Sequence, residues 1–380
     1  MSELRTRPTQ RLPRHADARP LPPRSRPNCN DLIPANGCCP ECGPKDVYFE
    51  LYKETALGIK AADALVRVGG PATAMLSWIP EFTAWCRANG APIDFVSSHL
   101  YPTDPQLPLG RDSFMVAVAN ASAQAAAAGL PFLLTEFNAG LGKPSENSGY
   151  SMLDSSYAAA FLFHQHLLAQ AVPNLMSMSY WTFTDWGFEE QGVDPLPYNP
   201  GTTKFGIIND EGVPKPAFRG LQLISQAAGD AVLRVTPAAG AGGDARVYAA
   251  GVGATAGAID VSVTTAGGVV TALLASFNAT GCALPAPTAV TITFRNLSAP
   301  LPTGATLELI DAANANPMAA WIAAGSPLYS SSQVIFTELA ASQVNVVPLA
   351  VTPAGDGAVS VTVTLQPFAM ARVRVTTGAQ

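Results

Sequence analysis

The sequence predicts an α/β region followed by an all-β region, for three reasons. Between residues 46 and 230, runs with helical periodicity alternate with short apolar runs, which is typical of parallel strands joined by helices. Beyond residue 230, valine- and threonine-rich runs alternate with a period of two, which favours an antiparallel β-sandwich. Because 48% of the 380 residues are hydrophobic and only 13% are charged, both regions can bury a core.

The first 46 residues show neither helical nor strand periodicity. They are rich in arginine and proline, so like-charge repulsion and missing backbone donors predict disorder. An arginine-rich start also resembles an organellar transit peptide, whereas the first 30 residues lack the apolar stretch of a secretory signal. Four of the six cysteines lie between residues 29 and 42. A zinc site, a redox pair, local disulfides and an inert loop are all alternatives for this cluster.

The α/β region predicts nine elements from residue 47 to residue 228. Helical spacing of apolar residues, as in Phe49, Tyr52, Ala56 and Ile59, predicts the helices, and Gly129 is a helix-ending signal. The helices are expected at residues 47–63, 78–89, 112–128, 155–171 and 215–228. Short apolar runs bounded by Gly, Pro or polar residues predict strands at residues 65–68, 93–98, 131–135 and 175–181.

The all-β region predicts strands at residues 232–235, 258–263, 269–277, 289–294 and 361–365. Lysine and histidine are absent after residue 231, and carboxylates are few. We therefore expect a structural accessory domain without a catalytic site of its own.

Polar and aromatic residues follow the ends of the predicted parallel strands, which is where a (β/α)8 barrel carries its active site. Glu136 ends a buried strand, so partial desolvation would suit it as a nucleophile or general base. The alternative is a carboxylate in a surface loop. His99 and Tyr101 end the preceding strand in the same way.

Aromatic residues flank carboxylates after the last predicted parallel strand. Trp181 precedes Asp185, and two further aromatic residues precede Glu189. Aromatic rings that stack on the C–H faces of sugars beside carboxylates that accept hydroxyl protons are typical of carbohydrate sites. The alternative is an aromatic cap over the core.

Three stretches together resemble glycoside hydrolase family 39, which contains β-xylosidases and α-L-iduronidases. They are Asp-Phe-Val-Ser-Ser-His-Leu-Tyr-Pro-Thr-Asp at residues 94–104, Leu-Thr-Glu-Phe-Asn at 134–138, and Ser-Tyr-Trp-Thr-Phe-Thr-Asp at 179–185. Residues 48–53, 68–72, 188–190 and 312–327 fit the same family. The resemblance covers about residues 46–375 in the family's order.

The resemblance implies a retaining glycosidase that acts on non-reducing-end sugars, with β-xylosides as the first substrate class and α-L-iduronides as the second. It implies that residues 47–230 are the last four units of a (β/α)8 barrel, and that residues 231–380 are an accessory β-sandwich. Glu136 matches the nucleophile, and no cofactor or metal is expected. Substrate-binding positions are assigned to His99, Tyr101, Trp181, Asp185 and Glu189.

The sequence departs from the family at the second carboxyl group. Retention needs two carboxyl groups about 5–5.5 Å apart, one as nucleophile and one as acid/base. The family carries the acid/base glutamate in an Asn-Glu-Pro-Asn motif, which this chain lacks, and Ser25-Arg-Pro-Asn28 would place Arg26 there. Because a guanidinium group cannot act as a general acid, we expect impaired catalysis. A non-catalytic glycan-binding homologue and a truncated gene are the alternatives.

Charge and hydropathy exclude other classes of partner. The net charge of −6 argues against nucleic-acid binding, and no apolar run reaches the roughly 18 residues of a membrane-spanning helix. The family resemblance implies a carbohydrate as the partner. The family resemblance suggests a secreted or lysosome-like location, and three glycosylation sequons, at Asn120, Asn278 and Asn296, are compatible with it.

Overall fold

The computed structural model describes residues 45–140, 152–185, 198, 204–237, 246–248, 253–279, 284–297, 300–327, 330–355 and 357–377. Contacts divide the chain between Lys45 and Asp46, so the elements beyond this point belong to one compact unit. The expected disordered segment as far as residue 44, with Arg26 and the cysteine cluster, lies outside the described residues, as does Glu189.

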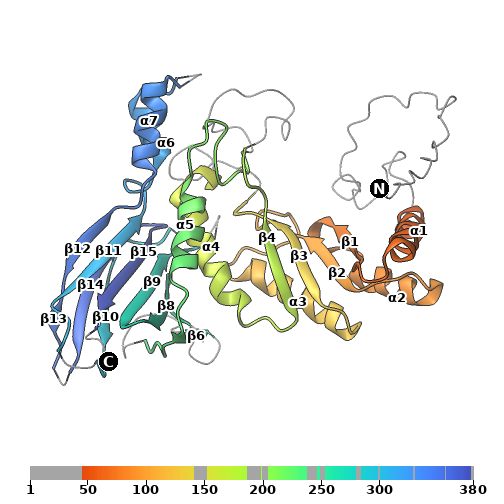
Figure 1. Cartoon of the computed structure of the whole chain (residues 1–380), viewed down its shortest axis with the longest axis horizontal. Coiled ribbons are helices and arrows are strands. Elements are labelled where there is room, and N and C mark those ends of the chain that lie inside the picture. The colour runs from red at the N-terminus through yellow and green to blue at the C-terminus, as the bar shows by residue number, and fades with distance from the viewer. Residues whose placement is uncertain are drawn as a thin grey trace, which may run out of the picture. The chain divides into compact units, whose positions relative to one another are not determined.

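The first half of this unit is built on a four-stranded parallel sheet (Figure 1). Its strands are β1 (Gly69–Thr73), β2 (Phe95–His99), β3 (Phe132–Phe137) and β4 (Leu175–Tyr180), arranged in sequence order. All three strand pairs are parallel, which confirms the predicted pairing of the second and third strands. The carboxyl ends of the four strands consequently lie at one edge of the sheet.

Helices connect these strands, close to the predicted ranges. They are α1 (Lys45–Ala62), α2 (Ile79–Asn89), α3 (Ser113–Ala127), α4 (Ser156–Ala169) and α5 (Pro216–Gln226), with 3-10 turns η1 (Ala74–Leu76) and η2 (Met152–Asp154). The Ser155 hydroxyl caps α4 by accepting a hydrogen bond from the Tyr157 backbone N–H at 3.3 Å. Gly90, with a φ of 65°, ends α2 in the left-handed conformation that glycine adopts without strain.

The prediction of a first strand at residues 65–68 was wrong. Leu65 is 88% exposed and lies in the turn after α1, and the strand begins only at Gly69. A side chain at Gly69 would lie 2.3 Å from the ring of Phe95 on the neighbouring strand, so a strand here requires glycine. The Gly-Gly-Pro sequence that predicted a strand end therefore begins the strand, because close approach of backbones outweighs local propensity.

The second half of the unit contains two antiparallel sheets. The larger has the order β12-β11-β15-β9-β8-β7-β6, with β5 paired to β8, and the smaller has the order β10-β14-β13. The strands are β5 (Ala231–Val232), β6 (Arg246–Tyr248), β7 (Gly253–Ala256), β8 (Ile259–Ala266), β9 (Val269–Ser276), β10 (Thr288–Phe294), β11 (Gly304–Ile310), β12 (Val346–Ala350), β13 (Thr352–Pro353), β14 (Val359–Leu365) and β15 (Met370–Thr376). Alternate residues of β14 are buried, as a strand with one face on a core requires.

Two helices that the sequence analysis missed, α6 (Pro317–Ala323) and α7 (Ser332–Ala341), lie between β11 and β12. Asn316 and Ser331 cap them by accepting hydrogen bonds from Ala319 N–H and Val334 N–H. Among the described residues, no helix is long and apolar enough to cross a membrane.

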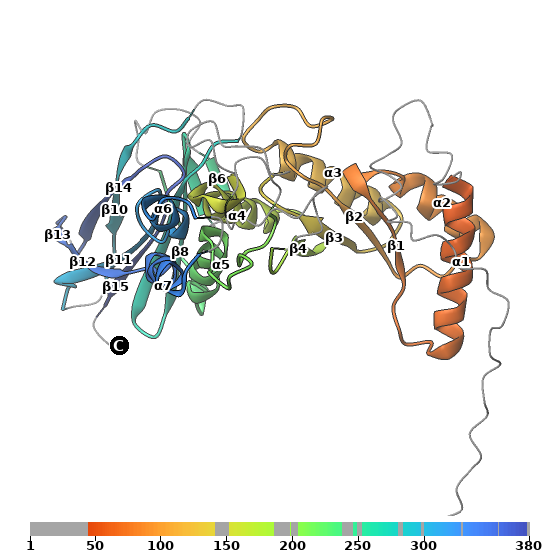
Figure 2. The ribbon, with the colours of Figure 1, turned by 90° about the horizontal axis from the view of Figure 1, so that it is seen from above.

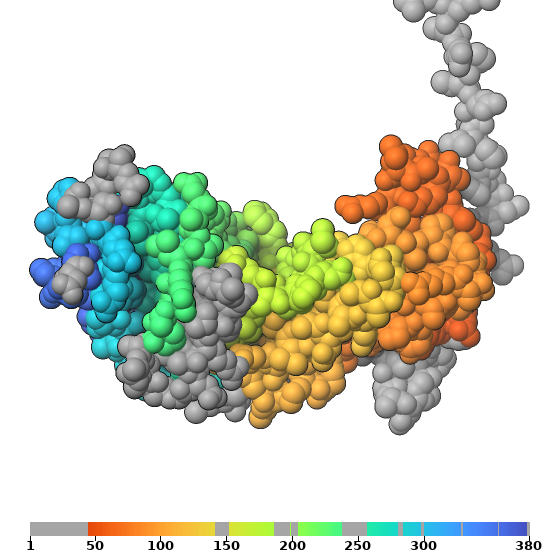
Figure 3. Space-filling view, turned by 90° about the horizontal axis from the view of Figure 1, so that it is seen from below, coloured from red at the N-terminus to blue at the C-terminus, as the bar shows by residue number. Residues whose placement is uncertain are grey.

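One hydrophobic core joins the parallel sheet to the antiparallel sheets. Leu134 of β3, Phe277 after β9 and Met370 of β15 belong to the same buried cluster. Helices α4 and α5 lie between the two kinds of sheet (Figures 1 and 2), and α4 contacts both β9 and β15. In the space-filling view, green and teal surfaces lie next to each other (Figure 3). After α5, the Ala227 carbonyl accepts a hydrogen bond from the Thr264 hydroxyl of β8. The contacts do not divide the chain at the predicted boundary between residues 230 and 231.

A buried ionic network lies at this junction. Asp260 Oδ2 of β8 lies 3.0 Å from His164 Nδ1 of α4 and 2.6 Å from Arg111 Nη2, while His164 Nε2 lies 3.2 Å from Asp112 Oδ1. Burial alone would lower the pKa of His164, but the charge of Asp260 and hydrogen bonds to both aspartates raise it. Burial opposes ionisation of Asp260 as well, yet His164 and Arg111 hold its pKa below the ordinary value.

Candidate active site

Glu136 is the next-to-last residue of β3, at the carboxyl edge of the parallel sheet. Its side chain is partly buried, and the Tyr101 hydroxyl donates a hydrogen bond to Glu136 Oε1. The neighbouring strand fixes this arrangement, because His99 pairs with Glu136 in register and Leu100 N–H donates to the Glu136 carbonyl at 3.2 Å. The hydrogen bond holds one carboxylate oxygen of Glu136 in a fixed position, as a nucleophile requires.

The loop after β2 holds Tyr101 in place. Asp104 Oδ2 accepts a hydrogen bond from Tyr101 N–H at 2.9 Å, and the Tyr101 ring lies 6.0 Å from the ring of Phe205. Both Tyr101 and His99 are buried. Tyr101, one of the predicted substrate-binding residues, is thus held where its hydroxyl contacts Glu136.

Asn138 joins the ends of β3 and β4, a role that the sequence analysis did not assign. It is fully buried, and its amide nitrogen donates to the carbonyls of Trp181 and Phe205, the latter at 3.0 Å. Its amide oxygen accepts hydrogen bonds from the Tyr180 hydroxyl, at 2.5 Å, and from the Ala139 backbone N–H. Because one amide satisfies groups on three segments, it fixes their relative positions at the carboxyl edge.

Trp181 directly follows β4, and its side chain is 36% exposed. The Trp181 backbone N–H donates to the Phe137 carbonyl at 2.8 Å, one residue beyond Glu136. The peptide bond between Trp181 and Thr182 is cis. The structure thus places Trp181 beside the end of the strand that carries Glu136, with part of its surface available for contact.

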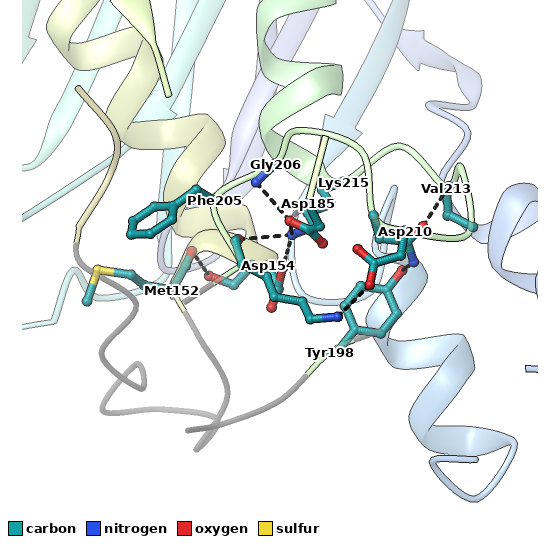
Figure 4. Close-up of polar contacts among 12 residues, drawn as sticks. Met152, Asp154, Asp185, Tyr198, Phe205, Gly206, Asp210, Val213 and Lys215 are labelled. Atoms are coloured by element: carbon teal, nitrogen blue, oxygen red, sulfur yellow. Dashed lines mark hydrogen bonds and ion pairs between the residues drawn. The ribbon is translucent and has the colours of Figure 1, made fainter. Parts of the chain in front are cut away.

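Asp185 is buried in an ion cluster (Figure 4). Asp185 Oδ1 accepts hydrogen bonds at 2.8 Å from both Lys215 Nζ and the Gly206 backbone N–H. On the other side of the same ammonium group, Asp154 Oδ1 lies 2.6 Å from Lys215 Nζ. The expected sugar contact of Asp185 has no support in this geometry, because the carboxylate is held inside the protein.

The cluster perturbs the ionisation of its members. Burial raises the pKa of Asp185 to about 7 although the Lys215 charge opposes the shift, and it raises the pKa of Asp154 in the same way. Burial would lower the pKa of Lys215, but the two aspartates more than compensate and raise it. Neither Asp154 nor Lys215 has a distinctive sequence context, so only their spatial convergence identifies the cluster.

The sequence model of glycosyl hydrolases family 39 matches residues 43–357, which is most of the chain. The chain belongs to glycosyl hydrolases family 39. This match includes Glu136, Trp181 and the antiparallel sheets as far as β13.

Two curated family relatives are described as β-xylosidases. The protein from Caldicellulosiruptor saccharolyticus is 39% identical over 219 residues, which are 55% of this chain and 41% of the relative. The protein from Geobacillus stearothermophilus is 31% identical over 206 residues, which are 50% of this chain and 38% of the relative. The matched part thus spans about two fifths of each relative.

Solved structures share the fold at low sequence identity. A family 39 enzyme from Xanthomonas axonopodis pv. citri has a TM-score of 0.63 and 23% identity, covering 88% of this chain and 64% of that one. A monomeric β-xylosidase from Caulobacter crescentus CB15 has a TM-score of 0.61 and 22% identity, covering 88% and 66%. A bacterial orthologue of human α-L-iduronidase has a TM-score of 0.59 and 17% identity, covering 87% and 58%.

Proposed function

We propose that this chain is a retaining, β-xylosidase-like glycosidase module in which Glu136 is the nucleophile. The main support is the position of Glu136: it lies at the carboxyl edge of a parallel sheet and accepts a hydrogen bond from Tyr101. The β-xylosidase names of the two curated relatives favour a xyloside as substrate. We also propose that the sheet is the last four β/α units of a (β/α)8 barrel.

The proposed reaction begins with attack of the Glu136 carboxylate on the anomeric carbon. The glycosidic C–O bond breaks, the leaving oxygen takes up a proton, and a glycosyl ester of Glu136 forms that water then hydrolyses. The Tyr101 hydroxyl would hold the carboxylate in one orientation. Trp181 would stack on the sugar ring and His99 would contact its hydroxyl groups, and Glu189 remains part of the proposed sugar site.

Protonation of the leaving group requires a general acid, and this sequence lacks the Asn-Glu-Pro-Asn motif in which the family carries it. Absence of a general acid costs about 10²- to 10⁴-fold in rate. Glycosides with good leaving groups need little protonation, so we propose that the chain reacts with activated aryl xylosides and hardly with xylobiose. Efficient cleavage of xylobiose would show that another carboxyl group supplies the proton.

The experiment is covalent trapping with 2,4-dinitrophenyl 2-deoxy-2-fluoro-β-xyloside, followed by mass spectrometry of the whole chain. We expect one glycosyl adduct, located on the peptide that contains Glu136, and none in the Glu136→Gln variant. An adduct at another residue, or the absence of an adduct from the unchanged folded chain, would contradict the proposal.

Two alternatives have different outcomes in the same experiment. The trapping is repeated with a 2-fluoro α-L-iduronide in place of the xyloside. An α-L-iduronidase-like activity, which the shared fold with the iduronidase orthologue permits, would give an adduct with this iduronide but not with the xyloside. A non-catalytic glycan-binding protein, favoured by the partly exposed ring of Trp181, would bind xylo-oligosaccharides without forming an adduct.

A further inference from the structure

We propose that Lys215 is a positioning residue of the candidate site: its buried ammonium group fixes the Trp181 segment, residues 181–185, against the end of the strand that carries Glu136. The importance of this placement for catalysis depends on the function proposed above. The placement itself is a property of the fold and can be tested without any catalytic activity.

The Trp181 segment has little packing of its own. Trp181 and Phe183 are exposed, Phe183 by 65%, and Thr184 is exposed as well, whereas Asp185 is buried. Segments with few buried apolar contacts open locally at low cost in free energy. Backbone hydrogen bonds and the anchoring of Asp185 therefore contribute to holding this segment in place.

Backbone hydrogen bonds tie the segment to residues 205–208. Thr182 N–H donates to the Phe205 carbonyl, and Ile207 N–H donates back to the Thr182 carbonyl, both at 3.0 Å. The ladder continues from Ile208 N–H to the Phe183 carbonyl at 3.1 Å and from Asp185 N–H to the Ile208 carbonyl at 2.9 Å. Backbone hydrogen bonds, including an isolated bridge between Thr184 and Ile208, thus hold the Trp181 segment beside these residues.

Lys215 binds both sides of this ladder. Its backbone N–H donates to the Ile207 carbonyl at 2.9 Å, and its ammonium group donates to the Lys204 carbonyl at 3.1 Å. The same ammonium group donates to Asp185 Oδ1 at 2.8 Å, at the end of the Trp181 segment (Figure 4). One side chain consequently closes the ladder at the end remote from Trp181.

A third contact extends the anchor to the segment that follows the Glu136 strand. Asp154, in η2, lies 2.6 Å from Lys215 Nζ and is buried. Among the described residues, Asp154 Oδ2 and Asp185 Oδ2 have no hydrogen-bond partner, so the ammonium group is the main compensation for two buried carboxyl groups. Lys204 pairs instead with Asp210, at 2.9 Å. Replacement of Lys215 should therefore disturb both carboxyl groups.

The test is hydrogen exchange of the full chain, followed by mass spectrometry on peptides that cover residues 175–185 and 204–215. The first variant is Lys215→Met, which keeps an unbranched side chain one atom shorter than lysine and removes its charge. The second is Lys215→Met combined with Asp154→Asn and Asp185→Asn, which leaves no uncompensated charge and guards against misfolding of the single variant. We expect exchange in both peptides to accelerate by roughly tenfold or more, while β8 and β9 stay as protected as in the unchanged chain.

The matched control removes another buried ion pair, between Arg372 of β15 and Glu308 of β11, by Arg372→Met with Glu308→Gln. Exchange in residues 175–185 should not change in this control. Unchanged exchange of the two peptides in the triple variant would overturn the proposal. Acceleration throughout the chain, or failure of the triple variant to fold, would also overturn it, because Lys215 would then serve global stability.

Trapping of Glu136 adds a catalytic readout. If the unchanged chain forms the xylosyl adduct, the triple variant should form it at least about tenfold more slowly, and the Arg372 control should form it at the normal rate. A normal trapping rate in a triple variant with accelerated exchange would show that the placement of Trp181 does not matter for the reaction. If the unchanged chain forms no adduct, the proposed function fails, while hydrogen exchange still decides whether Lys215 positions the segment.

Discussion

The buried network of His164, Asp260, Arg111 and Asp112 predicts a pH-dependent stability that one substitution should remove. The pKa of His164 is raised, so its contribution to folding is fully present below about pH 6.5, the ordinary value for histidine, and is lost as the pH rises through the folded-state value. The pKa of Asp260 is lowered, so its contribution is present above its ordinary value and is lost as the pH falls through the folded-state value. The network therefore stabilises most in mildly acidic solution.

Asp260→Asn tests this reasoning, because it keeps the shape of the side chain and removes the negative charge between buried His164 and partly buried Arg111. Breaking a buried ion pair costs about 3–5 kcal/mol. With about 2 °C per kcal/mol for a unit of this size, the Tm at pH 5.5 should fall by roughly 6–10 °C. The loss should become smaller as the pH rises towards 8.5, because the raised pKa of His164 means that the imidazole gives up its proton, and with it the interaction, only as the pH increases.

The assay is thermal unfolding of the full chain followed by circular dichroism at half-unit steps from pH 5 to 9. The control is Glu308→Gln, which breaks a buried pair that contains no histidine and should lower the Tm by a similar amount at every pH. An equal loss at pH 5.5 and 8.5 in Asp260→Asn would refute the assigned role of the His164 proton.

Two further predictions concern the candidate site. Tyr101→Phe removes the hydrogen bond to Glu136 and should slow xylosyl trapping by about 10- to 100-fold with little change in Tm, because hydrogen bonds to charged groups contribute about 1.5–3 kcal/mol. An unchanged trapping rate would show that this bond is irrelevant to the reaction. Gly206→Ala places a Cβ atom 2.1 Å from the Asp185 backbone nitrogen and should lower the Tm by several degrees. Gly58→Ala, in an open position within α1, should instead raise the Tm slightly, and equal effects of the two variants would contradict the tight approach at Gly206.

Much of the parallel sheet could be predicted from the sequence, since the helices and three of its four strands produce clear periodic patterns. The prediction failed at β1, where the contact between Gly69 and Phe95 decides the position of the strand. It also missed α6 and α7, because helices of 7 and 10 residues are too short for a helical period to stand out in a valine- and alanine-rich region. Local sequence patterns indicate propensity and burial, but they do not indicate which segments of the backbone lie close together in the fold.

The candidate site was predictable where residues follow strand ends, as Glu136, Tyr101 and Trp181 do. Asp185 shows the limit of this rule. It lies near aromatic residues in sequence, yet its carboxylate is buried against Lys215, which is 30 positions away. The importance of Asn138 was equally hidden, because its partners come from β4 and from the segment at residue 205.

The core that passes through α4 has a consequence for any attempt to divide the protein. The ring of Tyr157 lies 5.6 Å from that of Phe277, in the antiparallel region, and the ring of Phe161 lies 6.4 Å from that of Phe137 of β3, so aromatic contacts on this helix reach both neighbouring regions. Cleavage near residue 230 would expose an apolar helix on one fragment and an apolar sheet face on the other, and each fragment would be prone to precipitate. A domain boundary drawn from sequence patterns is therefore a poor place to cut this chain, and its two halves should melt in a single calorimetric transition.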